Sequence, residues 1–240
     1  MVFADMISRQ LCETSSTRVP PRVNIYISGF PCVDSSALGR RKGLDGITMS
    51  AMWSTLHYIV RYRPTTFVCE NMVYGAGRLP PAIKEFMRQL RRRARCYDVQ
   101  EFVLDALDYG LHTSRKRVFI VGVLQPLLKL PFCDWLGILN SLKFKATKRI
   151  QQSLLDNTCS LLRNACSFGL SSLTELEKAH LAKLRSSIGA SMGKSMIDLS
   201  VRWAFSYAVG ATPTITMSSK LWCPWLSRSL APLEHFALLG

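Results

Sequence analysis

Val-Asn-Ile-Tyr-Ile-Ser-Gly-Phe-Pro-Cys, residues 23–32, is the stretch that decides the fold. Its first residues are mostly apolar and β-branched, which predicts a short buried strand over 23–27. Gly29 and Pro31 close that strand, and the thiol of Cys32 follows directly. Open α/β sheets carry their chemistry at the carboxyl ends of their strands, so Cys32 is the first candidate functional residue.

Strands and helices alternate after this stretch. Apolar residues recur every three or four positions over 49–60, which predicts a helix with one buried face. A second strand is predicted over 66–69, and a second helix over 82–90 with Pro80 and Pro81 at its start. This strand–helix–strand–helix order is typical of a parallel sheet.

Two further strands are predicted over 99–104 and 118–124. The segment between them, 105–117, is short and shows no helical period. A parallel crossover usually needs a helix, so we expect these two strands to form an antiparallel hairpin. After Gln125 the pattern weakens, although 173–187 is mixed in charge and predicted to be helical.

Composition limits the possible partners. The formal net charge of +15, from 31 Lys and Arg against 16 Asp and Glu, favours a polyanion such as nucleic acid. The arginine-rich run 88–95 is interpreted first as a solvated helix face, although attraction of nucleic acid would profit from it. We expect no membrane span and no secretion, because no apolar stretch is long enough and residues 1–9 lack an apolar core.

The eight cysteines do not suggest a metal site. None lies in a Cys-x-x-Cys pair, and no histidine lies at zinc-finger spacing from them. Without a secretory signal we interpret them as reduced thiols, most of them buried, and we expect no structural metal.

Several ordered segments together resemble the DNA (cytosine-5)-methyltransferases. Residues 29–32, Gly-Phe-Pro-Cys, resemble the catalytic Pro-Cys loop of that family, and 70–72, Glu-Asn-Met, resemble its Glu-Asn-Val element. Residues 108–118 resemble its Tyr-Gly-x-Pro-Gln-x-Arg-x-Arg segment. Residues 212–214, Thr-Pro-Thr, and 228–234 resemble its late Pro-Thr and Arg-x-Leu-Thr-Pro-x-Glu segment. Each motif alone is weak, whereas their order beside predicted strands is specific.

The resemblance implies a fold and a division of the chain. The fold class is α/β, a partial Rossmann-like S-adenosylmethionine-dependent methyltransferase fold with a mostly parallel sheet and an antiparallel last strand. The expected regions are a catalytic domain over 1–124, a target-recognition region over 125–209, and a return to the catalytic domain over 210–240.

The resemblance also implies catalytic roles. Cys32 is the nucleophile, because a thiolate adds to C6 of cytosine and thereby activates C5. Glu70 is the acid at N3, a role for which burial would have to raise its pKa. Arg117 anchors the cytosine O2, Asn71 braces the loop, and Arg115 supports the loop or a phosphate. Each has a plainer alternative: an inert buried thiol, a solvated carboxylate, or surface cations.

Nucleic-acid contacts are expected from the loop after Cys32 and from a late arginine. The family extrudes the target base, and Ser36 would contact a phosphate near it. The other expected contacts are Arg40, Arg41, Lys42 and Arg228.

Cofactor binding is less complete in this sequence. The resemblance implies S-adenosylmethionine and assigns Asp5, Phe30 and Pro31 to it. The Phe-x-Gly-x-Gly turn of the family, its ribose-binding acid and its closing segment are not found. Thr113 replaces the family's glutamine, and Ser35 replaces a phenylalanine. We therefore expect this polypeptide alone to be an incomplete catalyst, either a fragment or a degenerate paralogue.

The leading hypothesis is a DNA cytosine-5 methyltransferase. The expected partners are DNA and the cofactor, and the expected state is a monomer. A transfer-RNA cytosine-5 methyltransferase and a non-catalytic nucleic-acid-binding module remain alternatives. The expected location is the nucleus for a eukaryotic source and the cytoplasm otherwise.

Overall fold

The structure is a computed structural model that describes most of the chain in two compact units. The described residues are 22–30, 49–74, 77–127, 131–144, 150–155, 169–200, 206–216 and 219–239. The first unit combines Met1–Leu104 with Lys116–Ser141, and the second combines Asp105–Arg115 with Leu142–Gly240. The functional division expected from the sequence stays a prediction, since these units are defined by contacts alone.

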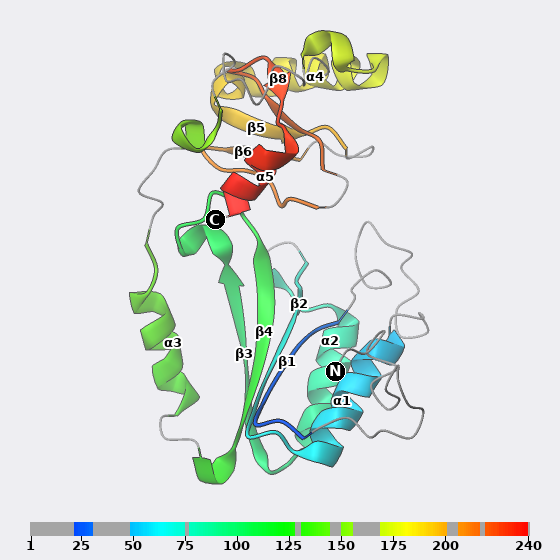
Figure 1. Ribbon diagram of the computed structural model, residues 1–240, viewed down its shortest axis with the longest axis vertical. Helices are drawn as coiled ribbons and strands as arrows, with labels where there is room; N and C mark the ends of the chain where they lie inside the picture. The colour runs from blue at the N-terminus through cyan, green and yellow to red at the C-terminus, as the bar shows by residue number, and fades with distance from the viewer. Residues whose placement is uncertain are drawn as a thin grey trace. The chain divides into compact units, whose positions relative to one another are not determined.

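The first unit is an α/β sheet with helices on its faces (Figure 1). Its elements are β1 (Ile25–Gly29), α1 (Met49–Tyr62), β2 (Thr66–Met72), α2 (Pro81–Arg93), β3 (Tyr97–Asp105), β4 (Lys116–Leu124), the 3₁₀ turn η5 (Gln125–Leu127) and α3 (Phe132–Ser141). The strand order is β1-β2-β4-β3.

Strand directions confirm the predicted fold class. β1 pairs with β2 in parallel, and β2 pairs with β4 in antiparallel register. The Gln125 N–H donates to the Cys96 carbonyl and the Ala106 N–H donates to the Arg115 carbonyl, as expected for an antiparallel hairpin of β3 and β4. β1, β2 and β3 therefore run in one direction and β4, the last in sequence, runs against them.

Apolar packing follows the predicted periodicity. The residues predicted to share one face of α1 are buried with α2 against the sheet, among them Met52, Leu56 and Ile59. α2 begins at Pro81, where the missing N–H of a proline costs no helical hydrogen bond. A separate apolar cluster joins the sheet to α3. Phe102 of β3 and Val121 and Val123 of β4 pack there against Trp135 and Leu139.

The second unit has its own antiparallel sheet, of order β6-β5-β7-β8. Its elements are η4 (Ala106–Asp108), η6 (Ile150–Ser153), η8 (Leu170–Ser172), α4 (Glu175–Ile188), η9 (Gly189–Lys194), β5 (Ser195–Asp198), β6 (Ser206–Val209), β7 (Leu221–Cys223), β8 (Arg228–Ser229) and α5 (Pro232–Leu239). α4 confirms the helix predicted over 173–187, and Thr174 caps it together with Glu177.

Sequence reasoning did not predict α3 or the second sheet. The strands of that sheet contain two to four residues each, which is too few for an alternating apolar pattern to be recognised. Among the described residues, no helix is both long enough and apolar enough to span a membrane.

Candidate active site at the ends of β1 and β2

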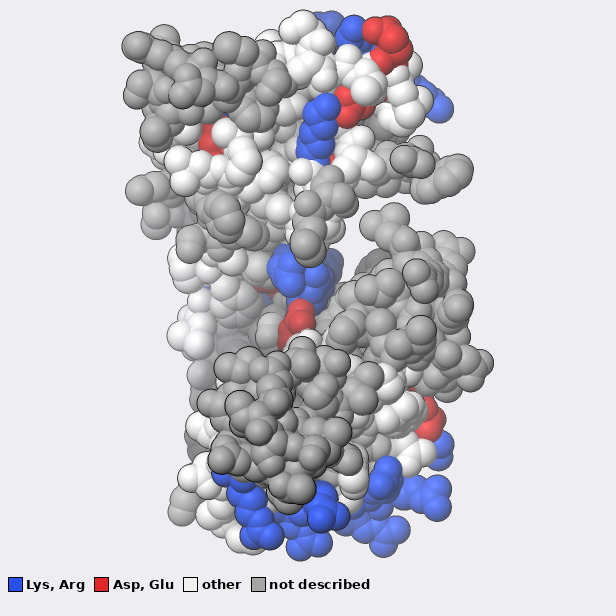
Figure 2. All heavy atoms as spheres, turned by 45° about the vertical axis from the view of Figure 1, so that its right-hand side comes forward, with Lys and Arg blue, Asp and Glu red and all other residues white. Residues whose placement is uncertain are grey.

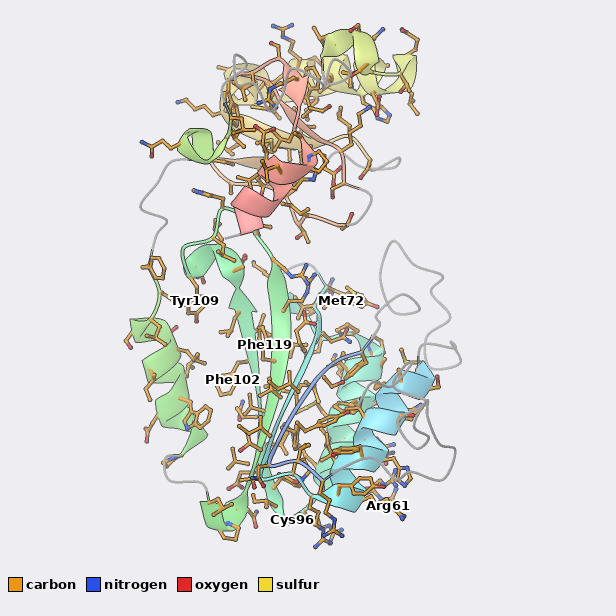
Figure 3. The ribbon with its side chains drawn as sticks, viewed as in Figure 1. Arg61, Met72, Cys96, Phe102, Tyr109 and Phe119 are labelled. Carbon is orange, nitrogen blue, oxygen red and sulfur yellow. The ribbon has the colours of Figure 1, made fainter. Side chains whose placement is uncertain are left out.

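Glu70 lies where β1 ends. The parallel register places Glu70 of β2 opposite Gly29, the last residue of β1. A Cβ on Gly29 would lie 3.5 Å from Glu70 Oε2, so the carboxyl group lies against the end of β1. Met72 and Phe119, labelled in Figure 3, mark this region of β2 and of the neighbouring β4. The register therefore brings the carboxyl group close to the segment that leads into Pro31 and Cys32.

Arg117 forms an ion pair with Glu70. Arg117 Nε lies 2.8 Å from Glu70 Oε1, and the side chains are 19% and 32% exposed, respectively. The antiparallel pairing of β4 with β2 explains the contact, since Arg117 is opposite Met72, two residues beyond Glu70. The Glu70 side chain is only partly buried, and its carboxyl group faces a cation.

Asn71 ties the two strand ends together. Its Nδ2 donates to the Phe30 carbonyl at 3.0 Å in a buried hydrogen bond. Its Oδ1 accepts from the Met72 N–H at 2.8 Å, which holds the amide in one orientation. Asn71 was expected to brace the loop, and this hydrogen bond holds Phe30, the residue just before Pro31 and Cys32, to the end of β2.

Much of the predicted site lies outside the described residues. This applies to the nucleophile Cys32, to Asp5 and Pro31, and to the loop residues Ser36, Arg40, Arg41 and Lys42. The meeting of a thiol with Glu70 therefore stays a prediction, whereas the meeting of Glu70, Arg117 and the start of the Cys32 segment is observed.

Asp105 organises the segment that carries Arg115. Its carboxylate accepts the backbone N–H groups of Leu107 at 3.2 Å and Arg115 at 2.8 Å, and the Ser114 hydroxyl at 3.0 Å. Sequence reasoning passed over Asp105. The available signal was an acidic residue at a strand end, a position that favours hydrogen bonds to nearby backbone.

Thr113 and Thr212 join two motifs that are distant in sequence. Their hydroxyl oxygens are 2.8 Å apart and both side chains are buried. The Thr212 N–H also donates to the His112 carbonyl at 2.7 Å, and the Thr214 hydroxyl to the Ser114 carbonyl at 2.6 Å. Thr113, which replaces the family's glutamine, therefore forms a buried hydrogen bond that joins two segments of the second unit.

Arg228 has a different partner from the expected nucleic acid. Its guanidinium binds Glu234 in two places, at 2.7 and 2.8 Å, and also donates to the Leu155 carbonyl at 2.9 Å. The side chains of Arg228 and Glu234 are 8% and 1% exposed. This burial corrects the expectation of a phosphate contact, because little of the guanidinium is left accessible.

The first unit is therefore an α/β fold in which the side chains of Glu70, Asn71 and Arg117 lie together at the ends of the strands. A family model described as C-5 cytosine-specific DNA methylase matches residues 6–212. The chain belongs to this family, and the first unit is part of its Rossmann-like S-adenosylmethionine-dependent methyltransferase fold.

Curated relatives match over part of their length. The Type II methyltransferase M.NmeDI of Neisseria meningitidis serogroup C is 34% identical over 113 residues, covering 46% of this chain and 26% of the relative. M.HgiCI of Herpetosiphon aurantiacus is 30% identical over 150 residues, covering 60% of this chain and 34% of the relative. The chain thus spans about a third or less of these relatives.

Solved structures are similar at a lower level. A putative DNA modification methyltransferase encoded within a prophage of E. coli has a TM-score of 0.49 at 17% identity, covering 92% of this chain and 69% of its own. The S. pombe Dnmt2 methyltransferase has a TM-score of 0.40 at 20% identity, covering 60% and 46%.

The described residues include little of the expected S-adenosylmethionine site. Phe30 is the one described residue of those assigned to the cofactor, and its side chain is buried. Its ring packs against Phe86, with centroids 5.3 Å apart. The assignment of Phe30 to the cofactor stays a prediction, and the chemistry proposed below is confined to the cytosine ring.

Proposed function

We propose that the chain carries the cytosine-binding part of an S-adenosylmethionine-dependent DNA (cytosine-5)-methyltransferase. The supporting observation is the Glu70–Arg117 ion pair beside the end of β1, where Asn71 holds the Phe30 carbonyl. Family membership supplies the reaction class. The two curated relatives named above are bacterial, so a nuclear location gains no support from them.

The proposed chemistry begins at C6 of an extruded cytosine. The Cys32 thiolate forms a bond to C6, and the electrons of the C5–C6 double bond move into the ring toward N3. A proton held between Glu70 and N3 neutralises the charge that would otherwise accumulate there. C5 is then an enamine carbon, able to accept an electrophile such as the donor's methyl group or a proton from water.

Arg117 has a positioning role in this proposal. Its Nε holds one Glu70 oxygen, which limits rotation of the carboxyl group and leaves the other oxygen, Oε2, for a base. Further guanidinium N–H groups suit the cytosine O2, since Arg presents several donors in a planar fork. Glu70 and Arg117 together would address adjacent polar atoms on one pyrimidine edge.

Exchange of the cytosine C5 hydrogen tests the proposal without a methyl donor. Addition of the thiolate lets C5 take a proton from water, and elimination then releases the original hydrogen. We expect the chain to release tritium from duplex DNA that contains [5-³H]deoxycytidine. Cys32→Ser abolishes release, and Glu70→Gln lowers its rate about 10²-fold or more, the typical contribution of general acid–base catalysis.

Matched controls separate the site from the rest of the chain. Cys96→Ser removes another free thiol, directly before β3, and leaves tritium release unchanged. Labelled tRNA replaces the duplex to test the transfer-RNA alternative. DNA binding without any tritium release would contradict the proposed chemistry and favour a non-catalytic binding module.

A further inference from the structure

The sheet face that carries Glu70 is built from cross-strand rows. In one row Gly29 of β1 is opposite Glu70 of β2, which in turn is opposite Phe119 of β4. Figure 3 labels Phe119 and also Met72, which lies in the next row opposite Arg117. Directly opposed residues point to the same face of a sheet, so the Phe119 ring stands beside the Glu70 carboxyl group. Phe119 therefore neighbours both members of the ion pair, since Arg117 precedes it by two positions on β4.

The Phe119 ring is not used by the core. It is only partly buried, and it belongs to none of the apolar clusters that the described residues form. It also pairs with no other aromatic ring of the described residues. Val121, two positions further along β4 on the same face, is instead buried with Phe102 and side chains of α3. The cluster beneath α3 thus ends before Phe119, whose ring is left for another contact.

The same face is open on its β1 side. β1 lies at the edge of the described sheet, and Ile27, two positions before Gly29 and on the same face, is 69% exposed. Gly29 has no side chain, and even a Cβ there would lie 3.5 Å from Glu70 Oε2. A larger side chain at this position would cover the carboxyl oxygen. The described residues of β1 therefore leave that side of Glu70 open.

A pyrimidine ring needs two kinds of contact from its site. Its edge carries hydrogen-bond donors and acceptors, which a carboxyl group and a guanidinium fork can hold. Its two faces are π-surfaces, which stack on aromatic side chains. Glu70 and Arg117 supply the first kind of contact, and Phe119 supplies the second beside them.

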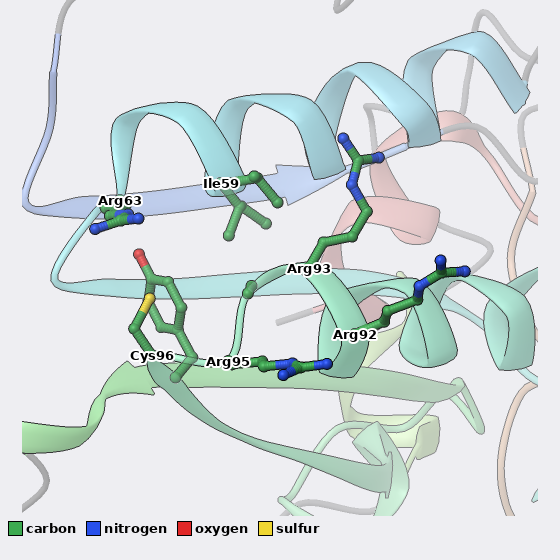
Figure 4. Close-up of a pocket in the computed structure, with 9 residues that line it drawn as sticks. Ile59, Arg63, Arg92, Arg93, Arg95 and Cys96 are labelled. Carbon is green, nitrogen blue, oxygen red and sulfur yellow. The ribbon is translucent and has the colours of Figure 1, made fainter.

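The basic end of the same unit offers no comparable grouping. Figure 2 shows Lys and Arg side chains gathered at the lower end of that view. A shallow hollow near the start of β3 is lined by Arg63, Arg92, Arg93 and Arg95, but Figure 4 shows their guanidinium groups apart and pointing in different directions. These arginines therefore do not converge on one ligand, whereas Glu70 and Arg117 are in contact beside Phe119.

We propose that Phe119 is a base-contacting residue, on whose ring the extruded cytosine stacks while Glu70 and Arg117 hold its edge. This assignment rests on the cytosine-binding site of the proposed function. Stacking requires a flat base, and addition of a thiolate makes C6 tetrahedral, so the contact is made with the bound base more than with the adduct. Loss of the ring should therefore weaken substrate binding more than it slows the chemical step.

Binding of single-stranded DNA tests the contact without turnover and without base extrusion. The probes are an oligodeoxycytidine and an abasic oligonucleotide of the same length and charge. The wild-type chain binds the oligodeoxycytidine more tightly. Phe119→Leu weakens that binding about tenfold, as expected for the loss of a base–aromatic stack, and leaves binding of the abasic probe unchanged. Phe119→Tyr, which keeps an aromatic ring, retains the wild-type affinity.

Phe102→Leu is the matched control. Phe102 is a phenylalanine on the same sheet face, but it is 6% exposed within the cluster beneath α3. Its replacement lowers the melting temperature and leaves the preference for oligodeoxycytidine unchanged. Equal loss of that preference in both leucine variants would overturn the proposal, because it would report a general loosening of the sheet. So would a wild-type chain without the preference, or Phe119→Leu with the wild-type preference.

Tritium release distinguishes this proposal from the proposed function. With labelled DNA, Phe119→Leu raises the half-saturating DNA concentration about tenfold and changes the maximal rate far less. A lower maximal rate at an unchanged half-saturating concentration would overturn the stacking role. If the wild type releases no tritium and still prefers oligodeoxycytidine through Phe119, the proposed reaction fails and the base contact stands.

Discussion

Asn71 is the residue on which the geometry of the candidate site depends most directly. Its side chain joins the Phe30 carbonyl to the Met72 N–H in a largely buried setting. We expect Asn71→Ala to lower the free energy of unfolding by about 1–3 kcal/mol, because buried backbone groups lose their partners. Urea denaturation measures this change. Gln100→Ala, which removes a more exposed side-chain hydrogen bond to Glu101, is the control and costs about 0.5 kcal/mol or less.

The same substitution has a second consequence at the site. Without the amide, nothing described holds the Phe30 carbonyl to β2, so the segment leading to Cys32 is less well positioned. Tritium release should fall in Asn71→Ala even at temperatures where the variant is fully folded. A variant as stable and as active as Gln100→Ala would contradict the bracing role.

Arg228 and Glu234 form the most deeply buried ion pair among the described residues of the second unit. Burial opposes ionisation of Glu234, but hydrogen bonds from Arg228 and from the Ala231 and Leu155 N–H groups outweigh it and lower its pKa. Arg228→Ala leaves that carboxylate buried without its cation, so we expect a loss of about 3–5 kcal/mol in unfolding free energy.

A double variant separates the pair from the burial penalty. Arg228→Met with Glu234→Leu removes both charges and fills the space with apolar atoms. It should cost less than Arg228→Ala alone, because no unpaired charge remains. Chemical denaturation of all three chains checks this order. A double variant less stable than the single one would show that the ion pair itself is a large net stabiliser.

At the scale of elements, Gly122 fixes how β2 packs beside β4. It is opposite Phe67 in the antiparallel register. A Cβ on Gly122 would lie 2.1 Å from an atom of the Phe67 ring, which is fully buried and cannot move aside freely. We expect Gly122→Ala to destabilise the first unit by about 1–3 kcal/mol through overpacking. Thermal unfolding measures it, and restored stability in Gly122→Ala with Phe67→Leu would confirm the cause.

β1 exposes apolar side chains on one face. Among the described residues it lies at the edge of the sheet, and Ile25 and Ile27 are 65% and 69% exposed. An exposed apolar edge strand promotes association between chains. We expect concentration-dependent association by light scattering, reduced in Ile27→Lys. Leu176→Lys, at an exposed leucine on α4, is the matched control; equal effects of the two would argue against a role of β1.

An element could be predicted from the sequence where its own residues carry a recognisable apolar pattern. α1 and α2 were predicted because their apolar faces repeat within one helix, and β1 and β2 because β-branched runs end at clear breakers. β5 to β8 contain two to four residues each, too few to show an alternating pattern, and β5 pairs with β7 rather than only with its neighbour in sequence.

The candidate site shows the same limit. Glu70, Asn71 and Arg117 were predicted from motif order, and the strand register then explained why they meet. The partly buried state of Glu70 and the full burial of Arg228 were not predictable, because burial depends on packing from distant segments. Residues 228–234 were singled out as a motif, but the motif did not indicate that its first and last residues, Arg228 and Glu234, bind each other.

On the scale of the whole molecule, buried titratable groups determine how stability depends on pH. Burial lowers the pKa of His112 below its ordinary value of 6.5. Burial also lowers the pKa of His235, although the charges of Glu234 and Asp198 oppose the shift. His235 Nε2 is buried without a hydrogen-bond partner among the described residues. The folded chain therefore resists protonation at both imidazoles.

Acid should destabilise the protein in two stages. As pH falls through 6.5, the unfolded chain protonates its histidines before the folded chain does, so the free energy of unfolding falls by up to about 1.4 kcal/mol per pH unit for each of these partly buried imidazoles. Below 4.5, the unfolded chain also protonates Glu234, whose lowered folded-state pKa contributes stability only at higher pH. Urea titrations between pH 4 and 8 measure both stages. His235→Phe removes one imidazole without leaving a hydrogen bond unmade, so it should flatten the first stage and leave the second in place; a profile identical to the wild type would show that His235 does not set the acid sensitivity.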